Sequence, residues 1–331
     1  MSKRILILGG HGFIGSHASH TLKKDDHTIG VVDCYHQYYT FPDAEYNTVL
    51  KQRQEWAGAD HVYEGRIEDR EFLKNTFTQF QPDVVVHVAT YPNAGMVRKN
   101  VEDATGNMIS ATANVLDLCV EHKVKRLVFA SSSMAYGDFG DTQAVETSSM
   151  DPLTLYGAYK LTGEQMVRIW HQEHKLEYSI LRPSAVYGTR DMITRVISKL
   201  THGVLTKGMM TVQGVDTKLD FTNVIDVGNA FATCAVHPDA ANQIFNCTLG
   251  NGRNVTEAAE MIRSRLGGEI EITTKDKFYP NRDTLNSDKL KSLGWNPTIQ
   301  LEEGIAKYLD WFLMQPHAKL LPNYKQIQNA V

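Results

Sequence analysis

Two side chains in the middle of the chain have the types and spacing of a proton-transfer pair. Tyr156 and Lys160 stand four residues apart, so both lie on one face of the segment if it is helical. An ammonium beside a phenol favours the phenolate and lowers the pKa of the tyrosine. Such a tyrosine can take the proton of an alcohol while a hydride leaves the carbon. The alternative is that Tyr156 is a surface residue of an amphipathic helix, because this spacing alone is common.

A run of three serines supplies a candidate partner for this pair. Ser132 ends an apolar run at 126–132, which predicts a buried strand. Doubly wound folds bind ligands at the carboxyl ends of their strands. A serine there can hydrogen-bond the reacting oxygen, and Ser133 is close enough to compete for the role. The alternative is a serine turn without a function.

A glycine-rich turn near the start of the chain predicts a site for a dinucleotide. Gly9, Gly12 and Gly15 follow an apolar run and precede a helical pattern. Glycines there allow a tight turn, a close approach of the diphosphate and close packing of the helix. Asp33 ends the next predicted strand, where a carboxylate accepts both ribose hydroxyls and repels a 2′-phosphate, so NAD is favoured over NADP. The alternative is a structural turn with Asp33 as a capping residue.

The elements that must position these residues alternate along the first 180 residues. Apolar runs without clean alternation predict strands buried on both faces. They are residues 4–10, 27–33, 83–89, 126–132 and 177–184. Helical spacing occurs at residues 14–24, 69–80, 101–122 and 155–174. This alternation predicts an α/β fold with a doubly wound parallel sheet, the Rossmann fold.

The second half of the chain is less regular and predicts a smaller, partly interleaved C-terminal α/β substrate domain. Residues 1–182 are predicted to form the NAD-binding domain, with 216–240 interleaved into it, and 183–331 the substrate-binding domain. Helices are expected near 190–200, 226–236, 256–266 and 301–313. The Tyr-rich segment 34–51 predicts a loop or a short helix.

Composition excludes several classes of protein. The 331 residues are 42% hydrophobic and 22% charged, with a formal net charge of −4, which argues against collagen, disorder and nucleic-acid binding. The four cysteines are far apart, which argues against a disulfide framework and a zinc site. The thirteen histidines show no placed third ligand, so no metal is expected. No apolar run is long enough for a signal peptide core or a membrane span, so we expect a cytoplasmic protein.

Taken together, the motifs resemble the extended short-chain dehydrogenase/reductase family, and within it the NAD-dependent sugar-nucleotide epimerases and dehydratases. The resemblance covers nearly the whole chain. It rests on GGHGFIG (9–15), SSSMAYGD (131–138), YGAYK (156–160), LRPSAVYG (181–188), LDFTNVIDV (219–227) and LGWNPTIQLEEGI (293–305). Residues 33–53 and 87–98 are similar to segments of UDP-glucuronate 4-epimerases.

The resemblance implies roles for particular residues. Ser132, Tyr156 and Lys160 would be catalytic, with Lys160 also holding the nicotinamide ribose. The cofactor-binding residues would be Gly9, Gly12, Phe13, Ile14, Gly15, Asp33, Ala89 and Lys160. Thr90, Ser133 and Arg282 would contact a small-molecule substrate, expected to be a nucleotide sugar. Apolar stripes on 101–122 and 155–170 would form a homodimer interface; ordinary burial against the sheet is the alternative.

The same motifs indicate the type of reaction. Family dehydratases place Asp-Glu after the catalytic hydroxyl residue, whereas this chain has Ser133 and Met134. The remaining groups suffice for a 4-epimerase, which oxidises the sugar transiently and returns the hydride to the other face. They also suffice for a dehydrogenase of a sugar, polyol or hydroxy acid without a diphosphate. Ala185 and Leu219, where the family has a phosphate-holding Asn and Arg, favour that alternative. A non-catalytic NAD-sensing protein is a third hypothesis, against which the intact Ser/Tyr/Lys set argues.

Overall fold

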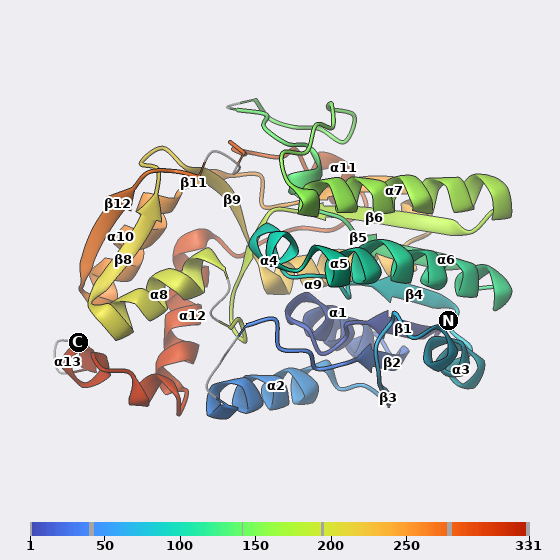
Figure 1. Ribbon diagram of the computed structural model, residues 1–331, viewed down its shortest axis with the longest axis horizontal. Helices are drawn as coiled ribbons and strands as arrows, with labels where there is room; N and C mark the ends of the chain where they lie inside the picture. Colours follow the sequence, from blue (N-terminus) through green and yellow to red (C-terminus); the bar gives the residue numbers. More distant parts are fainter. Residues whose placement is uncertain (1, 40–42, 141, 193–194, 277–279, 329–331) are drawn as a thin grey trace.

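A seven-stranded parallel sheet forms the centre of the larger part of the molecule, on the right in Figure 1. The computed structural model describes residues 2–39, 43–140, 142–192, 195–276 and 280–328. The strand order is β10-β6-β5-β4-β1-β2-β3. The strands are β1 (Arg4–Leu8), β2 (Thr28–Asp33), β3 (His61–Glu64), β4 (Val84–His87), β5 (Arg126–Ala130), β6 (Glu177–Pro183) and β10 (Gln243–Cys247). This order confirms the doubly wound fold. It places a switch point between β1 and β4, where such sheets open a crevice for ligands.

Helices cover both faces of the sheet, so the strands are buried on both sides as their apolar runs predict. On one face, side chains of α1 and α9 pack with Ile5 and Ile7 of β1. On the other face, α3, α6 and α7 pack with Leu6 and Leu8 of the same strand. The helices of these two layers are α1 (Phe13–Lys24), α3 (Arg70–Phe80), α6 (Ala111–Glu121), α7 (Leu155–His174) and α9 (Val224–Val236).

The helix predicted at 101–122 is interrupted. It consists of α5 (Val101–Thr105), a π-helical segment at Gly106–Ser110 and α6. Before the interruption, Thr105 forms a hydrogen bond with the hydroxyl of Tyr159 on α7. After it, α6 faces the sheet. A π-helical turn shifts the register of a helix, and the shift lets the two parts contact different neighbours.

Three further elements differ from the sequence prediction. The segment expected to be a loop or short helix contains α2 (Asp43–Ala57), a longer helix whose few buried side chains stand among polar ones. Strand β3 was not predicted because it is a short edge strand with mostly exposed residues. Strand β10 was not predicted because Gln243 and Asn246 interrupt its apolar pattern.

The C-terminal part has its own apolar core and small sheets, β11-β9-β7 and β12-β8. Its strands are β7 (Ala185–Tyr187), β8 (Met209–Gln213), β9 (Lys218–Asn223), β11 (Gly252–Asn254) and β12 (Glu269–Thr273). Its larger helices are α8 (Val196–Lys207), α10 (Val255–Leu266) and α12 (Leu301–Met314), and it also contains the short helices α11 (Asp288–Lys291) and α13 (Tyr324–Gln328). A further short helix, α4 (Ala94–Lys99), precedes α5 in the first part of the chain.

Helix α8 begins later than the predicted helix near 190–200. Arg190 has a left-handed backbone with φ of 67°, and helical structure begins only at Val196. Helix α9 then returns to the first core and packs against α1. The division into 1–182 with 216–240 and 183–331 remains a proposal. The sheets depart from it at two strands, since β9 (218–223) pairs with β7 and β11, and β10 (243–247) joins the seven-stranded sheet. Among the described residues, no helix is both long and apolar enough to cross a membrane.

A buried ion pair connects α7 with β6. The Arg182 guanidinium donates two hydrogen bonds to the Glu164 carboxylate, at 2.8 and 2.6 Å. Both side chains are almost fully buried. Ser131 donates to the same carboxylate, and Arg182 Nη1 also donates to the hydroxyl of Tyr136. The pair therefore holds the start of the serine run against α7.

Removing one partner of this pair leaves the other charge buried without compensation. We predict that Glu164→Ala lowers the free energy of unfolding by about 3 to 5 kcal/mol. The matched control is Glu260→Ala, which breaks the exposed pair with Arg263 and is expected to cost less than about 1 kcal/mol. Urea denaturation of the three proteins measures both effects, and equal losses in the two variants would contradict the prediction.

Candidate active site

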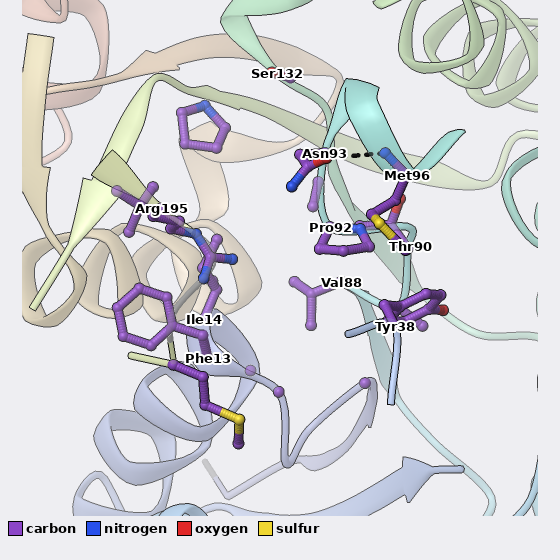
Figure 2. A pocket seen from close by; sticks show the side chains of 18 of the residues that line it. Phe13, Ile14, Tyr38, Val88, Thr90, Pro92, Asn93, Met96, Ser132 and Arg195 are labelled. Atoms are coloured by element: carbon purple, nitrogen blue, oxygen red, sulfur yellow. Dashed lines mark hydrogen bonds between the residues drawn. The ribbon is translucent and has the colours of Figure 1, made fainter. Parts of the chain in front are cut away.

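A cavity of about 600 Å³ opens where the carboxyl ends of β1, β2, β4, β5 and β6 meet the C-terminal part of the chain. Figure 2 shows Phe13, Ile14 and Arg195 on one side of it, across from Thr90, Asn93 and Met96. The lining includes all of the predicted catalytic and cofactor residues, together with Thr90 and Arg282. The structure therefore brings together residues that are far apart in the sequence, from Gly9 to Arg282.

The glycine turn is compressed to a degree that only glycine permits. Gly9 has φ of 80°, and a Cβ atom there would lie 2.8 Å from backbone atoms of Ala89. A Cβ atom on Gly15 would overlap the carbonyl oxygen of Gly9. Helix α1 begins at Phe13, and among the described residues no side chain caps its first N–H groups. A helix N-terminus left open in this way fits the diphosphate of a dinucleotide.

The Asp33 carboxylate is fixed at the end of β2 beside this turn. One of its oxygens accepts a hydrogen bond from the backbone N–H of His11 and the other from that of Tyr35, both at 3.0 Å. Each oxygen has a second lone pair available. Because the side chain lines the cavity, its position fits the predicted contact with a ribose.

A glycine in α7 lets Tyr156 lie beside Ser132. Thr154 caps the helix by accepting a hydrogen bond from the N–H of Gly157, at 3.1 Å. A Cβ atom on Gly157 would overlap the carbonyl oxygen of Met134, so α7 approaches the serine turn more closely than another residue would allow. At this approach the Ser132 hydroxyl is near enough to Tyr156 to lower the pKa of its phenol.

Burial raises the pKa of Tyr156, and the polar groups around it counteract that effect. The opposing influences on this pKa are the positive charge of Arg195, the hydroxyl of Ser132 and the positive charge of Arg282. The Lys160 ammonium lies 5.7 Å from the centre of the Tyr156 ring and donates to the carbonyl oxygen of Ala130 at 2.7 Å. The effect of Lys160 on the tyrosine remains a prediction.

Lys160 itself is strongly affected by its surroundings. Burial lowers the pKa of its ammonium to about 7, and the negative charge of Glu164, one turn further along α7, acts in the opposite direction. A lysine that titrates near neutrality can exchange a proton with its surroundings. The Tyr156, Lys160 and Ser132 arrangement can therefore hold an alcohol oxygen and move its proton.

The predicted substrate residues occupy different environments. Thr90 lines the cavity, and within the described part of the chain its buried hydroxyl oxygen has no hydrogen-bond partner. Such an orphaned group fits a contact with a ligand. Arg282 lines the cavity and donates to the hydroxyl of Ser133 at 2.7 Å. Ser133 is fully buried and also donates to Ser184, so it supports Arg282, and its own contact with substrate remains a prediction.

Sequence reasoning missed Arg195, which lines the same cavity. The predicted helix near 190–200 placed this residue inside a helix, where a single arginine carries no signal. In the structure it is the residue that precedes α8 and faces Phe13 (Figure 2). A correct prediction of the first residue of that helix would have been needed to identify Arg195 as a residue of the site.

Comparison with known proteins gives the family. A model of the NAD dependent epimerase/dehydratase family matches residues 5–248. The chain belongs to this family. It is an NAD-dependent enzyme of the extended short-chain dehydrogenase/reductase type, as the motifs predicted, and NAD is its cofactor.

Individual members of the epimerase/dehydratase family align over almost the whole chain. A putative UDP-glucose 4-epimerase of Methanocaldococcus jannaschii is 29% identical, covering 93% of this chain and 97% of that protein. The human dTDP-D-glucose 4,6-dehydratase is 25% identical, covering 100% and 94%. The solved structure of the Thermotoga maritima UDP-glucose 4-epimerase with UDP-glucose has a TM-score of 0.82 at 26% identity, covering 93% and 98%.

Filling the compressed glycine turn is expected to block the cofactor. We predict that Gly15→Ala abolishes measurable NAD binding, since the added methyl group overlaps the Gly9 carbonyl and displaces the N-terminus of α1. The control is Gly106→Ala, where a Cβ atom would meet nothing within 4 Å. Calorimetric titration with NAD compares both variants with the wild type, and normal affinity in Gly15→Ala would refute the assignment of the turn.

The lowered pKa of Lys160 predicts a pH dependence of stability. Between about pH 7 and its usual value of 10.5, the unfolded chain binds a proton on this lysine that the folded protein does not. The free energy of unfolding therefore gains a contribution that rises with pH across this window. Lys160→Met removes that rise, whereas the exposed Lys207→Met keeps it. Urea denaturation at several pH values provides the test, and parallel curves for wild type and Lys160→Met would contradict it.

Proposed function

We propose that this enzyme is an epimerase of a sugar nucleotide that inverts the configuration at C4. The sugar would enter the cavity with its C4 hydroxyl between Ser132 and Tyr156. Bound NAD supplies a hydride acceptor for the oxidation and a hydride donor for the return. Oxidation converts the C4 alcohol to a ketone, and reduction from the opposite face after the sugar rotates gives the epimer, with no net redox change.

The chain's own residues perform the proton transfer in this scheme. Tyr156, as the phenolate, takes the hydroxyl proton during oxidation and gives it back during reduction. Ser132 donates a hydrogen bond to the same oxygen and keeps it in line with the tyrosine. Lys160 stabilises the phenolate and holds the cofactor ribose. A single reversible proton carrier is sufficient, because the same proton leaves and returns.

The distribution of carboxylates in the cavity carries the proposal. Among the described lining residues, the only acidic side chains are Asp33 and Glu68. Both lie at the β2 and β3 side, whereas Ser132 follows β5, and β4 and β1 separate the two regions of the sheet. Elimination of water from a sugar needs an acid and a base beside the reacting carbons. The absence of such a pair beside Tyr156 in the described lining favours epimerisation over dehydration.

The dehydrogenase alternative rests on the apolar lining of the substrate region. Leu219 and Ala185 both line the cavity. Neither side chain can hold a phosphate, and this favours a substrate without a diphosphate, such as a sugar, a polyol or a hydroxy acid. The two functions differ in their products. An epimerase forms the epimeric sugar without accumulating NADH, whereas a dehydrogenase accumulates NADH in proportion to the substrate consumed.

A homodimer remains a proposal as well. Helix α7 leaves Leu155 and Ile169 exposed, at 45% and 46% of their surface. Exposed apolar side chains on one helix are consistent with a contact between copies of the chain.

Removing the Tyr156 hydroxyl provides the decisive test. We predict that Tyr156→Phe lowers turnover of UDP-sugars by about 10²-fold or more while NAD affinity is retained. The control is Tyr159→Phe, since that hydroxyl bonds Thr105 outside the cavity; it is expected to leave turnover unchanged. Product analysis and NADH absorbance are recorded together. If Tyr156→Phe turned over UDP-sugars at the wild-type rate, the catalytic role of Tyr156 would be refuted. If the wild-type protein accumulated NADH, the dehydrogenase hypothesis would be favoured over the epimerase hypothesis.

A further inference from the structure

The segment that connects β7 with α8 forms one wall of the cavity and contains a backbone conformation that most residues avoid. Tyr187 and Met192, on either side of this conformation, line the cavity. Between them, Arg190 has φ of 67°. For a residue with a side chain this left-handed conformation costs free energy, and it persists only where surrounding contacts hold it. Contacts that hold Arg190 come from α2.

Arg53 of α2 holds the backbone of this residue. Its Nε and Nη2 atoms both donate to the carbonyl oxygen of Arg190, at 2.9 and 2.7 Å. Arg53 is buried, with 8% of its surface exposed. Burial lowers the pKa of its guanidinium to about 10, and the negative charge of Asp191 acts in the opposite direction. The group is therefore charged at neutral pH, and hydrogen bonds from a charged donor are stronger than those from a neutral one.

Trp56 of α2 holds the side chain of the same residue. It follows Arg53 by three residues, so the two side chains lie on one face of the helix. The Arg190 Cζ atom lies 3.8 Å from the centre of the Trp56 ring, a distance typical of a cation–π contact. The same ring stacks on His20 of α1, with 3.7 Å between the ring centres. Residue 190 is thus fixed through both its backbone and its side chain.

The residue that follows connects this contact to the start of α8. The Asp191 carboxylate accepts a hydrogen bond from Arg195 Nη1 at 2.7 Å and another from the hydroxyl of Ser198 at 3.2 Å. Asp191 is almost fully buried. Because Asp191 is bonded directly to residue 190, a displacement of that residue would move the carboxylate and both of its partners.

Helix α2 also borders the C-terminal part of the chain. Figure 1 shows it beside α12, and Gln52 donates to Gln315 across this contact at 2.6 Å. On the side of the cavity, Met192 packs against Tyr46 and Val49 of α2. The connection between β7 and α8 therefore rests on α2 both before and after Asp191.

We propose that Arg53 is a positioning residue, which fixes the cavity wall at Met192 and Arg195 by holding the backbone of residue 190. This wall would keep the sugar in a reactive orientation against Tyr156. The second step rests on the proposed function, because it takes the substrate to be a sugar that reacts at this tyrosine. A misplacement of about 1 Å is enough to slow a reaction by about 10²-fold, so the contact can affect turnover without touching the reacting atoms.

The test compares the NAD-loaded wild type with Arg53→Met, Arg53→Lys and the matched control Arg265→Met. Arg265 also donates to a backbone carbonyl, that of Ala306 at 3.3 Å, but it does not belong to the described lining of the cavity. The first measurement is hydrogen exchange of peptides that cover residues 186–192. The second is kcat and KM for epimerisation of UDP-glucose and UDP-glucuronate, with kcat expressed per NAD-bound molecule.

We expect faster exchange and slower turnover in Arg53→Met. Exchange in residues 186–192 should be about 10-fold faster or more, because two charged hydrogen bonds to the segment are lost. The kcat should fall by about 10- to 100-fold, with KM and NAD affinity within about 3-fold of the wild type. Arg53→Lys keeps the charge but not the paired donors, so a loss of about 3- to 10-fold is expected. Arg265→Met should match the wild type in both measurements.

The split between kcat and KM separates positioning from the other roles that Arg53 could have. A residue that only stabilises the fold would lower the free energy of unfolding and leave kcat per NAD-bound molecule unchanged. A residue that binds the substrate equally in the ground state and the transition state would raise KM and leave kcat unchanged. Either result, or unchanged hydrogen exchange in Arg53→Met, would overturn the proposal.

A further variant covers the case in which Arg53→Met does not fold. Trp56→Leu removes the ring beneath Arg190 and leaves Arg53 in place. It is expected to change exchange and kcat in the same directions by about 3-fold, the size of one cation–π contact. Wild-type values of both quantities in Trp56→Leu and in Arg53→Lys would refute the proposal.

The two measurements also distinguish this proposal from the proposed function. If the wild type epimerised neither sugar nucleotide, the proposed function and the effect of Arg53 on the sugar would both be refuted, and faster exchange in Arg53→Met would still support its hold on the segment. If the wild type epimerised a sugar nucleotide and Arg53→Met had the same kcat, only the role of Arg53 would be refuted.

Discussion

One face of α7 rests on the chain that leaves β5, and this contact decides where the reacting groups lie. Successive turns of the helix meet residues 130–134. Gly157 packs on the carbonyl of Met134, Lys160 donates to the carbonyl of Ala130, and Glu164 accepts from Ser131. The spacing of three and four residues is the period of the helix itself. The tyrosine and serine proposed as catalytic are therefore placed by packing along the whole face, and not by a single hydrogen bond.

This contact places several charged groups in the protein interior, which has an electrostatic cost. Lys160 is almost fully buried, and the lowering of its pKa reflects the cost of removing its charge from water. The Glu164 and Arg182 pair, immediately behind it, satisfies its own charges by two hydrogen bonds. Such a pair contributes little net stability compared with apolar packing. Its position suggests that it fixes the approach of α7 to the serine turn, on which the chemistry depends.

Local patterns in the sequence predicted the fold and much of the candidate site, and they failed where tertiary contacts decide. The glycine turn, Asp33 and the Tyr/Lys pair were recognisable because each depends on spacing within one strand–helix unit. Residues of the C-terminal half were harder to assign. Arg195 owes its place to a helix start that a left-handed residue at position 190 delays. Strand β3 and the π-helical segment carry little periodic signal, since one is exposed and the other changes the period.

The return of α9 to the first core has a consequence for how the protein could be divided. The chain leaves the first core after β6, builds β7, α8, β8 and β9, and comes back as α9 and β10 before it continues to the C-terminus. Neither unit is a contiguous stretch of sequence. A chain truncated after β6 would lack α9, which packs against α1, and β10, which forms the edge of the sheet. Exchange of the substrate-binding part between relatives would therefore require two coordinated splices, so new specificities are reached more readily by point substitutions in the cavity wall.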